Sequence, residues 1–208
     1  MALLSGLLLW LSYSPAKLFP LVYVALAPLM VALPQAKRFR QAFGWGFVAG
    51  LVFMGLTCYW IGVTVQGWTG SAIGWAAWAA LIPILATYYG LWSGVVWRLS
   101  RNLSSGERVM LYAASWVVLE WVRTLGSLSM PWAQLSYSQY LFTPVLQWCD
   151  LTGAYGLSFL IVLMNAGVAH WWQHRGQEQS VRWVGVAGLL LVLICLTGKL
   201  RTLVPTPT

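Results

Sequence analysis

Charged residues are what this sequence has least of. Only 8% of its 208 residues are Asp, Glu, Lys or Arg, and just four are acidic, whereas 60% are hydrophobic. A soluble globule needs polar side chains over most of its surface, and a disordered chain has few large apolar side chains. The composition therefore excludes both classes of protein and predicts that a lipid bilayer is the solvent.

Cysteine and the common catalytic motifs are also scarce. Cys58, Cys149 and Cys195 lie far apart and without C-x-x-C spacing, which supports neither a disulfide framework nor a zinc knuckle. Cys149 is the one candidate nucleophile, but no Lys or His lies near it in the sequence to activate the thiol. We therefore interpret the cysteines as packing residues. The stretch before Pro15 lacks a basic region and a cleavage site, so we expect a retained helix and not a signal peptide.

Glycine and tryptophan, by contrast, are abundant, with 20 and 15 residues. Small residues let membrane helices approach each other closely, and indole rings anchor helix ends at the level of the lipid headgroups. The Gly-x-x-x-Gly pairs at 46/50, 70/74 and 90/94 predict faces of close helix contact.

Apolar runs fill most of the chain and divide at charged residues, prolines and glycines. A helix needs about 20 apolar residues to cross a bilayer. The runs predict an all-α integral membrane protein, a bundle of about seven transmembrane helices in a single domain over residues 1–208. Pro83 predicts a kink or a split in the fourth helix. The expected helices are 3–13, 18–33, 41–65, 71–99, 109–125, 154–172 and 184–198.

The basic residues favour one side of this predicted bundle. Eight of the twelve Lys and Arg residues lie in the links after the second, fourth and sixth helices. The positive-inside rule then predicts a cytoplasmic N-terminus and an extracytoplasmic C-terminus. The net charge of +8 is therefore a topology signal, and we expect no nucleic-acid partner. The eight residues are Lys37, Arg38, Arg40, Arg98, Arg101, Arg108, Arg175 and Arg182.

One expected connection is much longer than the others. Residues 126–153 join the fifth and sixth helices on the predicted outer face, and they combine aromatic residues with prolines and small polar residues. Irregular backbone at membrane depth must be covered by protein or line a cavity. Long loops in compact proteins are more often functional than not. The functional site is therefore expected in this loop.

A few polar residues in the apolar segments are candidates for chemistry. Glu120 and Arg123 are three residues apart on one helix face, where they can pair, either as a functional intramembrane ion pair or as a brace for the following loop. Asp150 either pairs with Arg123 or caps the sixth helix, and we favour capping. His170 and His174 have the spacing of a zinc pair but lie at the basic end, so we expect neither a metal site nor a cofactor.

Short motifs in a fixed order resemble one bacterial family, the apolipoprotein N-acyltransferases. The resemblance spans essentially the whole chain and is most specific between Glu120 and Asn165. Ser129 departs from it, because the family usually has Gly followed by Phe before the Pro-Trp pair. The motifs are Ser14-Pro15, Lys37-Arg38-Phe39-Arg40, Tyr59-Trp60, Glu120-Trp121-Val122-Arg123, Met130-Pro131-Trp132, Tyr137-Ser138-Gln139, Pro144 and Gly153-Ala154-Tyr155-Gly156-Leu157-Ser158-Phe159-Leu160 with Asn165.

The resemblance implies a function and also a missing part. In that family the membrane helices support an extracytoplasmic nitrilase-like domain, in which a Glu-Lys-Cys triad moves an acyl chain from a phospholipid to the N-terminal diacylglyceryl-cysteine of a lipoprotein. None of the triad maps onto this chain, and the family's eighth helix is missing as well. The sequence ends at Thr208, where the nitrilase-like domain would begin. No catalytic residue is therefore expected here.

The resemblance implies the membrane half of a lipoprotein N-acyltransferase in the bacterial inner membrane, truncated or completed by a separately encoded nitrilase-like subunit. Phospholipid and diacylated lipoprotein are the implied partners. One alternative is a non-catalytic scaffold or lipid-binding assembly factor derived from the family. Another is a small transporter or channel, for which polar residues in several helices and paired broken helices are expected. The implied lipid- and substrate-access surface comprises Trp60, Glu120, Arg123, Pro131, Trp132, Tyr137 and Gln139.

Overall fold

The computed structural model describes residues 1–13, 15–126 and 129–203. The expected all-α class is confirmed, since the described residues form helices and contain no strand. Five short 3₁₀-helices lie between the α-helices in the part of the chain that the structure describes. The α-helices are α1 (Ala2–Leu11), α2 (Val22–Ala25), α3 (Ala27–Ala32), α4 (Phe39–Thr57), α5 (Trp60–Thr69), α6 (Ile73–Leu99), α7 (Ser105–Val122), α8 (Thr143–Leu146), α9 (Cys149–Gln173) and α10 (Arg182–Leu203). The 3₁₀-helices are Phe19–Leu21, Leu33–Gln35, Ser100–Asn102, Leu135–Gln139 and Glu178–Val181.

Among the described residues, four helices have the length and the apolar composition needed to cross a membrane. They are α4, α6 with its extension to Asn102, α9 and α10. α1 and the segment Phe19–Gln35 are apolar but shorter. The fold is therefore that of a multi-pass membrane protein.

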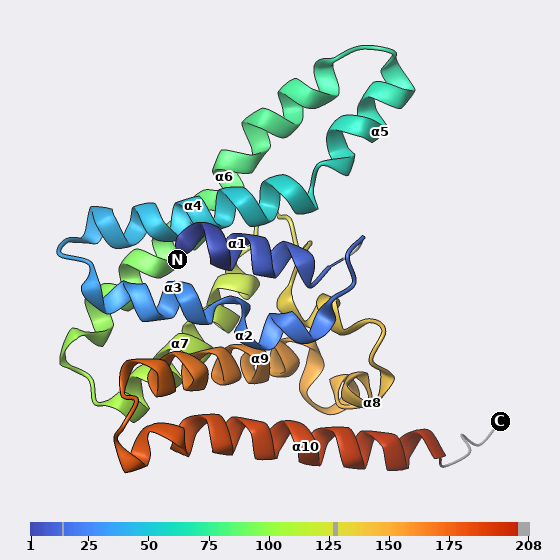
Figure 1. Ribbon diagram of the computed structural model, residues 1–208. Coiled ribbons are helices and arrows are strands. Elements are labelled where there is room, and N and C mark those ends of the chain that lie inside the picture. Colours follow the sequence, from blue (N-terminus) through green and yellow to red (C-terminus); the bar gives the residue numbers. More distant parts are fainter. Residues whose placement is uncertain (14, 127–128, 204–208) are drawn as a thin grey trace.

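The long helices run side by side through the body of the molecule (Figure 1). α4 packs against α1 and α6, while α9 packs against α7, α3 and α10. Gly46 on α4 lies so close to α6 that a Cβ atom there would collide with Ser93 Oγ and the Tyr89 carbonyl. This contact confirms the expected role of the first glycine pair. Gly70 instead takes a left-handed conformation at the end of α5 with open space around it, so it terminates a helix and is not part of a contact face.

The expected helix 41–65 is wrong, because the chain breaks between α4 and α5. α4 ends at Thr57, and Figure 1 shows α5 turning away to form an arm with the first half of α6. Trp78 Nε1 of α6 donates to the Gly55 carbonyl, 3.1 Å away, and so satisfies an acceptor near the end of α4. Of the kink or split expected at Pro83, the split does not occur, since α6 continues through this residue from Ile73 to Leu99.

The expected helix 18–33 is also interrupted. Its α-helical part divides into α2 and α3 at Leu26, and a side chain from α9 bonds to both pieces. Asn165 Nδ2 donates to the Val22 carbonyl at 2.7 Å, and its Oδ1 accepts from Leu26 N at 2.7 Å and Ala27 N at 3.1 Å. In addition, Ser5 Oγ accepts from Leu29 N at 2.9 Å. A broken helix is tolerated in a membrane when neighbouring side chains satisfy its backbone in this way.

Other boundaries differ by a few residues. α7 begins at Ser105, four residues earlier than expected, because Ser104 and Glu107 form a capping box. α9 begins at Cys149, five residues earlier than expected. Its first turn is separated from the rest of the helix by a kink at Gly153, whose φ of 66° and ψ of 178° are not helical. The long connection is therefore shorter and more ordered than expected, since it contains α8 and the 3₁₀-helix Leu135–Gln139.

Candidate functional site

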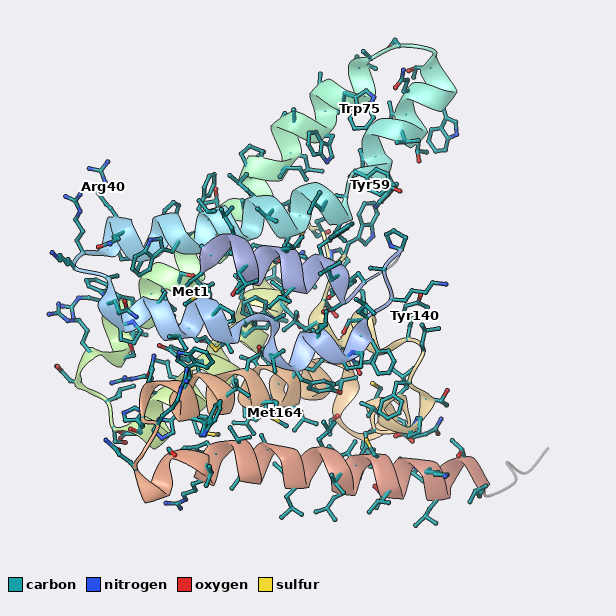
Figure 2. All side chains as sticks on the ribbon, viewed as in Figure 1. Met1, Arg40, Tyr59, Trp75, Tyr140 and Met164 are labelled. Atoms are coloured by element: carbon teal, nitrogen blue, oxygen red, sulfur yellow. The ribbon has the colours of Figure 1, made fainter. Side chains whose placement is uncertain are left out.

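The connection between α7 and α9, called the α7–α9 segment below, covers one end of the bundle. Its described residues are 123–126 and 129–148. Figure 2 shows Tyr140 of this segment at one end of the molecule and Arg40 at the other. The segment is nevertheless well buried on one side, because Leu135, Ser138 and Gln139 have almost no exposed surface.

Glu120, on the last turn of α7, is hydrogen-bonded to the backbone of this segment. Its side chain is only 1% exposed. Oε1 accepts from the Leu135 amide at 2.8 Å and from Trp116 Nε1 at 3.0 Å. Oε2 is buried and has no hydrogen-bond partner among the described residues. The carboxylate therefore serves as an acceptor for a backbone amide at the start of a 3₁₀-helix.

Arg123 holds the same segment one turn further along. Its side chain is 2% exposed, and Nη2 donates to the carbonyls of Trp132 at 2.6 Å and Met130 at 3.3 Å. Nη1 donates to Tyr89 Oη at 3.1 Å. Over the described ranges the only ion pair joins Arg201 and Asp150, so the expected pairing of Glu120 with Arg123 is wrong. Arg123 instead satisfies two backbone carbonyls of the segment, and Glu120 satisfies one of its amides.

A third anchor comes from the N-terminal part of the chain. Tyr23 Oη donates to Gln139 Oε1 at 3.1 Å, and Gln139 Nε2 donates to the Phe19 carbonyl at 3.3 Å. Tyr13 Oη donates to the Gln134 carbonyl at 2.6 Å. α9 adds one further bond, from the Ser136 amide to Ser158 Oγ at 3.2 Å. The α7–α9 segment is thus bonded to α6, α7, α9 and the N-terminal part of the chain.

Aromatic side chains on the outer side of the segment remain exposed. Trp132 is 45% exposed and Tyr137 is 46% exposed, and Pro131 is exposed as well. Trp60, at the start of α5, is 41% exposed, and its ring centroid lies 4.8 Å from that of Trp132. The seven residues singled out from the sequence therefore divide into two groups, since Glu120, Arg123 and Gln139 are buried anchors while the other four are exposed.

The expectations for Asp150 and the histidines have different outcomes. Asp150 neither caps α9 through its side chain nor pairs with Arg123. It pairs with Arg201 of α10, whose Nη1 lies 3.0 Å from Asp150 Oδ1 and 2.8 Å from the Gln147 carbonyl. His170 and His174 have ring centroids 4.3 Å apart. No cluster of three or more His, Cys, Asp or Glu suited to a metal ion is found within the described part of the chain.

The sequence reasoning missed several residues of this anchoring network. Tyr13 follows the end of α1, while Tyr23 and Tyr89 lie in α2 and α6; all three are buried and belong to none of the quoted motifs. Ser158 and Asn165 did belong to a motif, but the partners that they bond to in other elements are more than 20 residues away in the sequence. A buried polar residue in an apolar helix is the one signal that could have drawn attention to them.

Comparison with known proteins identifies the domain. Residues 5–167 match the family model described as the apolipoprotein N-acyltransferase N-terminal domain. The chain belongs to the apolipoprotein N-acyltransferase family. The match begins at Ser5, which bonds to α3, and it includes Asn165 and every anchor of the α7–α9 segment described above.

Curated apolipoprotein N-acyltransferases are similar over most of this chain. The protein of Geobacter metallireducens is 38% identical over 167 residues, which are 79% of this chain and 32% of that protein. The protein of Gloeobacter violaceus is 32% identical over 97% of this chain and 39% of its own length. The protein of Nitrosomonas europaea is 28% identical over 86% of this chain and 36% of its own length. The chain thus spans about a third of the length of these apolipoprotein N-acyltransferases.

Proposed function

We propose that this chain is the membrane domain of a lipoprotein N-acyltransferase, which brings phospholipid and diacylated lipoprotein to a nitrilase-type catalytic part. That part is either a separate subunit or the remainder of a longer polypeptide. The observation that carries the proposal is the α7–α9 segment, in which three buried polar anchors hold exposed aromatic side chains at the end of an apolar bundle.

The proposed topology has seven crossings in the bacterial inner membrane. They are α1, the segment Phe19–Gln35, α4, α6, α7, α9 and α10, with α5 outside the count. The N-terminus is cytoplasmic, and the α7–α9 segment and the C-terminal end of α10 face outward. Two observations support this arrangement: the links rich in Lys and Arg follow every second crossing, and Arg40 and Tyr140 lie at opposite ends (Figure 2).

The exposed aromatic residues form the proposed access surface. Trp60, Pro131, Trp132 and Tyr137 lie where lipid headgroups of the outer leaflet meet the protein, and aromatic rings are favoured at that depth. The flat apolar faces of these side chains can pack against acyl chains that move laterally from the bilayer onto the protein. Glu120, Arg123 and Gln139 keep the backbone of this surface in place and do not contact the substrate themselves.

The chemistry in this proposal belongs to the nitrilase-type part. There a cysteine thiolate attacks the ester carbonyl of the phospholipid, the acyl C–O bond breaks, and lysophospholipid leaves after taking up a proton, so that the acyl group remains as a thioester. The amino group of the lipoprotein then attacks the thioester; an amide bond forms, the C–S bond breaks, and the amine gives up a proton as the thiolate leaves. The contribution of this chain is to position the two substrates. An acyl donor and an acceptor amine that are held in the correct geometry react far faster than free reactants.

The test is the acylation state of lipoproteins in the source organism. Deleting the gene should leave lipoprotein N-termini diacylated, as measured by the mass of their N-terminal peptides, and wild-type copies should restore the third chain. A Trp60→Ala/Trp132→Ala variant should restore it poorly, whereas the matched control Trp171→Ala, an exposed Trp of α9 near the basic link 175–182, should restore it fully. Triacylated lipoproteins in the deletion strain would contradict the proposal.

A further inference from the structure

A pocket lies among the links that are rich in Lys and Arg. It has a volume of about 510 Å³ and is bordered by the end of α6, the start of α7 and the link before α4. Three of its lining residues are cationic and none carries a carboxylate in the described part of the chain. The lining residues are Pro34, Ala36, Lys37, Trp97, Ser100, Arg101 and Arg108.

The wall of this basic pocket is fixed by side-chain contacts. Trp97 is buried, and its Nε1 donates to the Ala36 carbonyl at 2.9 Å, which ties the link before α4 to the end of α6. The Arg101 guanidinium lies 5.3 Å from the centroid of the Trp97 ring, within the range of a cation–π contact. The Trp97 indole therefore contacts both the link before α4 and the Arg101 guanidinium, and so fixes two sides of the pocket.

The cations of the pocket lack acidic partners. The ion pair of Arg201 with Asp150 is the only one over the described ranges, and it involves none of these residues. Glu107 is adjacent to Arg108 in the sequence, but its carboxylate accepts from the Ser104 amide at 2.8 Å and from Ser104 Oγ at 2.6 Å. Arg108 Nε is buried and has no hydrogen-bond partner among the described residues, and Nη2 has only a 3.4 Å contact with the Leu103 carbonyl.

We propose that this pocket binds the phosphate of an anionic phospholipid headgroup from the leaflet on the basic side. Phosphate oxygens accept several charge-assisted hydrogen bonds at once, and the two guanidinium groups and the Lys37 ammonium supply the donors. A lipid is the favoured source of the phosphate because the pocket lies at the ends of apolar helices, where basic pockets recruit acidic lipids. The site is separate from the access surface, which lies at the other end of the bundle, and it does not depend on acyl transfer.

Native mass spectrometry of the purified protein in detergent tests the proposal. Phosphatidylglycerol, phosphatidylcholine or inorganic phosphate is added, and the fraction of protein carrying bound lipid is measured. Wild-type protein should retain phosphatidylglycerol in preference to phosphatidylcholine. A Lys37→Gln/Arg101→Gln variant should bind phosphatidylglycerol more weakly by about fivefold for each cation removed. The matched control Arg40→Gln/Arg175→Gln removes two exposed cations from the same group of links, outside the pocket.

The outcomes separate a pocket from diffuse surface charge. Equal losses in the pocket variant and the control variant would overturn the proposal, as would equal retention of the two lipids by wild-type protein. Displacement of phosphatidylglycerol by millimolar inorganic phosphate would also overturn it and would assign the pocket to a soluble anion. Lys37→Gln alone supports the same test if the double variant loses helical circular dichroism. Lys37 is exposed, and within the described residues only its backbone amide, and not its side chain, forms a hydrogen bond.

Discussion

Glu120 and Arg123 are charged side chains buried one turn apart, yet each binds backbone groups and not the other. The same pattern recurs at Asn165, which bonds to both sides of the break between α2 and α3. In all three cases the side chain satisfies a backbone amide or carbonyl that would otherwise lack a partner, and a buried group left unsatisfied costs about 1–3 kcal/mol. At the residue scale, the buried polar side chains of this domain therefore replace the hydrogen bonds that its irregular backbone cannot make with itself.

Replacing Glu120 distinguishes a brace from a headgroup contact. Glu120→Ala removes the acceptor for Leu135 N and Trp116 Nε1, and a buried donor left without a partner costs about 1–3 kcal/mol. We expect faster hydrogen exchange at the Leu135 amide and a lower melting temperature in detergent. Glu120→Gln retains the acceptor oxygen at Oε1 and should protect that amide nearly as well as wild type. Unchanged exchange in Glu120→Ala would contradict the bracing role.

The helices show which parts of the fold the sequence could predict. Apolar runs gave the all-α class and the approximate position of α6, α7 and α9, because hydrophobic length is a property of local sequence. The breaks at Leu26 and after Thr57 were not predictable in this way. They depend on Asn165 and Trp78, whose side chains reach the interrupted backbone from other helices. A pattern within one segment carries no information about such partners.

The candidate site was predictable to a similar extent. The motifs located the α7–α9 segment and its aromatic residues, including the Trp132 that lies against Trp60 in the structure. They also led to a pairing of Glu120 with Arg123 that does not form, because three-residue spacing shows only that two side chains share a helix face. The partner of each side chain depends on the backbone of the α7–α9 segment that packs over it.

The contact between α4 and α6 allows a prediction with a built-in control. A Cβ atom at Gly46 would collide with the Tyr89 carbonyl and with Ser93, so Gly46→Ala must push the helices apart. Overpacking of this kind costs about 1–3 kcal/mol, which should lower the melting temperature in detergent. Gly44→Ala lies on the same helix with open space around it and should be neutral or slightly stabilising. Similar melting temperatures for the two variants would show that α4 and α6 are not tightly packed at Gly46.

Considered as a whole, the molecule has two chemically different ends joined by an apolar body. One end carries the aromatic α7–α9 segment and the other carries the links with most of the Lys and Arg residues, as the positions of Tyr140 and Arg40 illustrate (Figure 2). Such polarity orients a bundle in a membrane, since basic links resist translocation while aromatic belts are accepted at either interface. The access surface and the basic pocket would then meet different leaflets.

Labelling of single cysteines tests this orientation directly. In a variant whose Cys58, Cys149 and Cys195 are replaced by Ala, one new cysteine is placed at Tyr140→Cys or at Arg40→Cys, both of which are exposed positions. A maleimide that cannot cross membranes should label Tyr140→Cys when it has access only to the extracytoplasmic side. Arg40→Cys should react only after the membrane is opened, because the positive-inside rule places its link in the cytoplasm. The reverse pattern would invert the proposed topology, and with it both the access surface and the basic pocket would face the opposite leaflets.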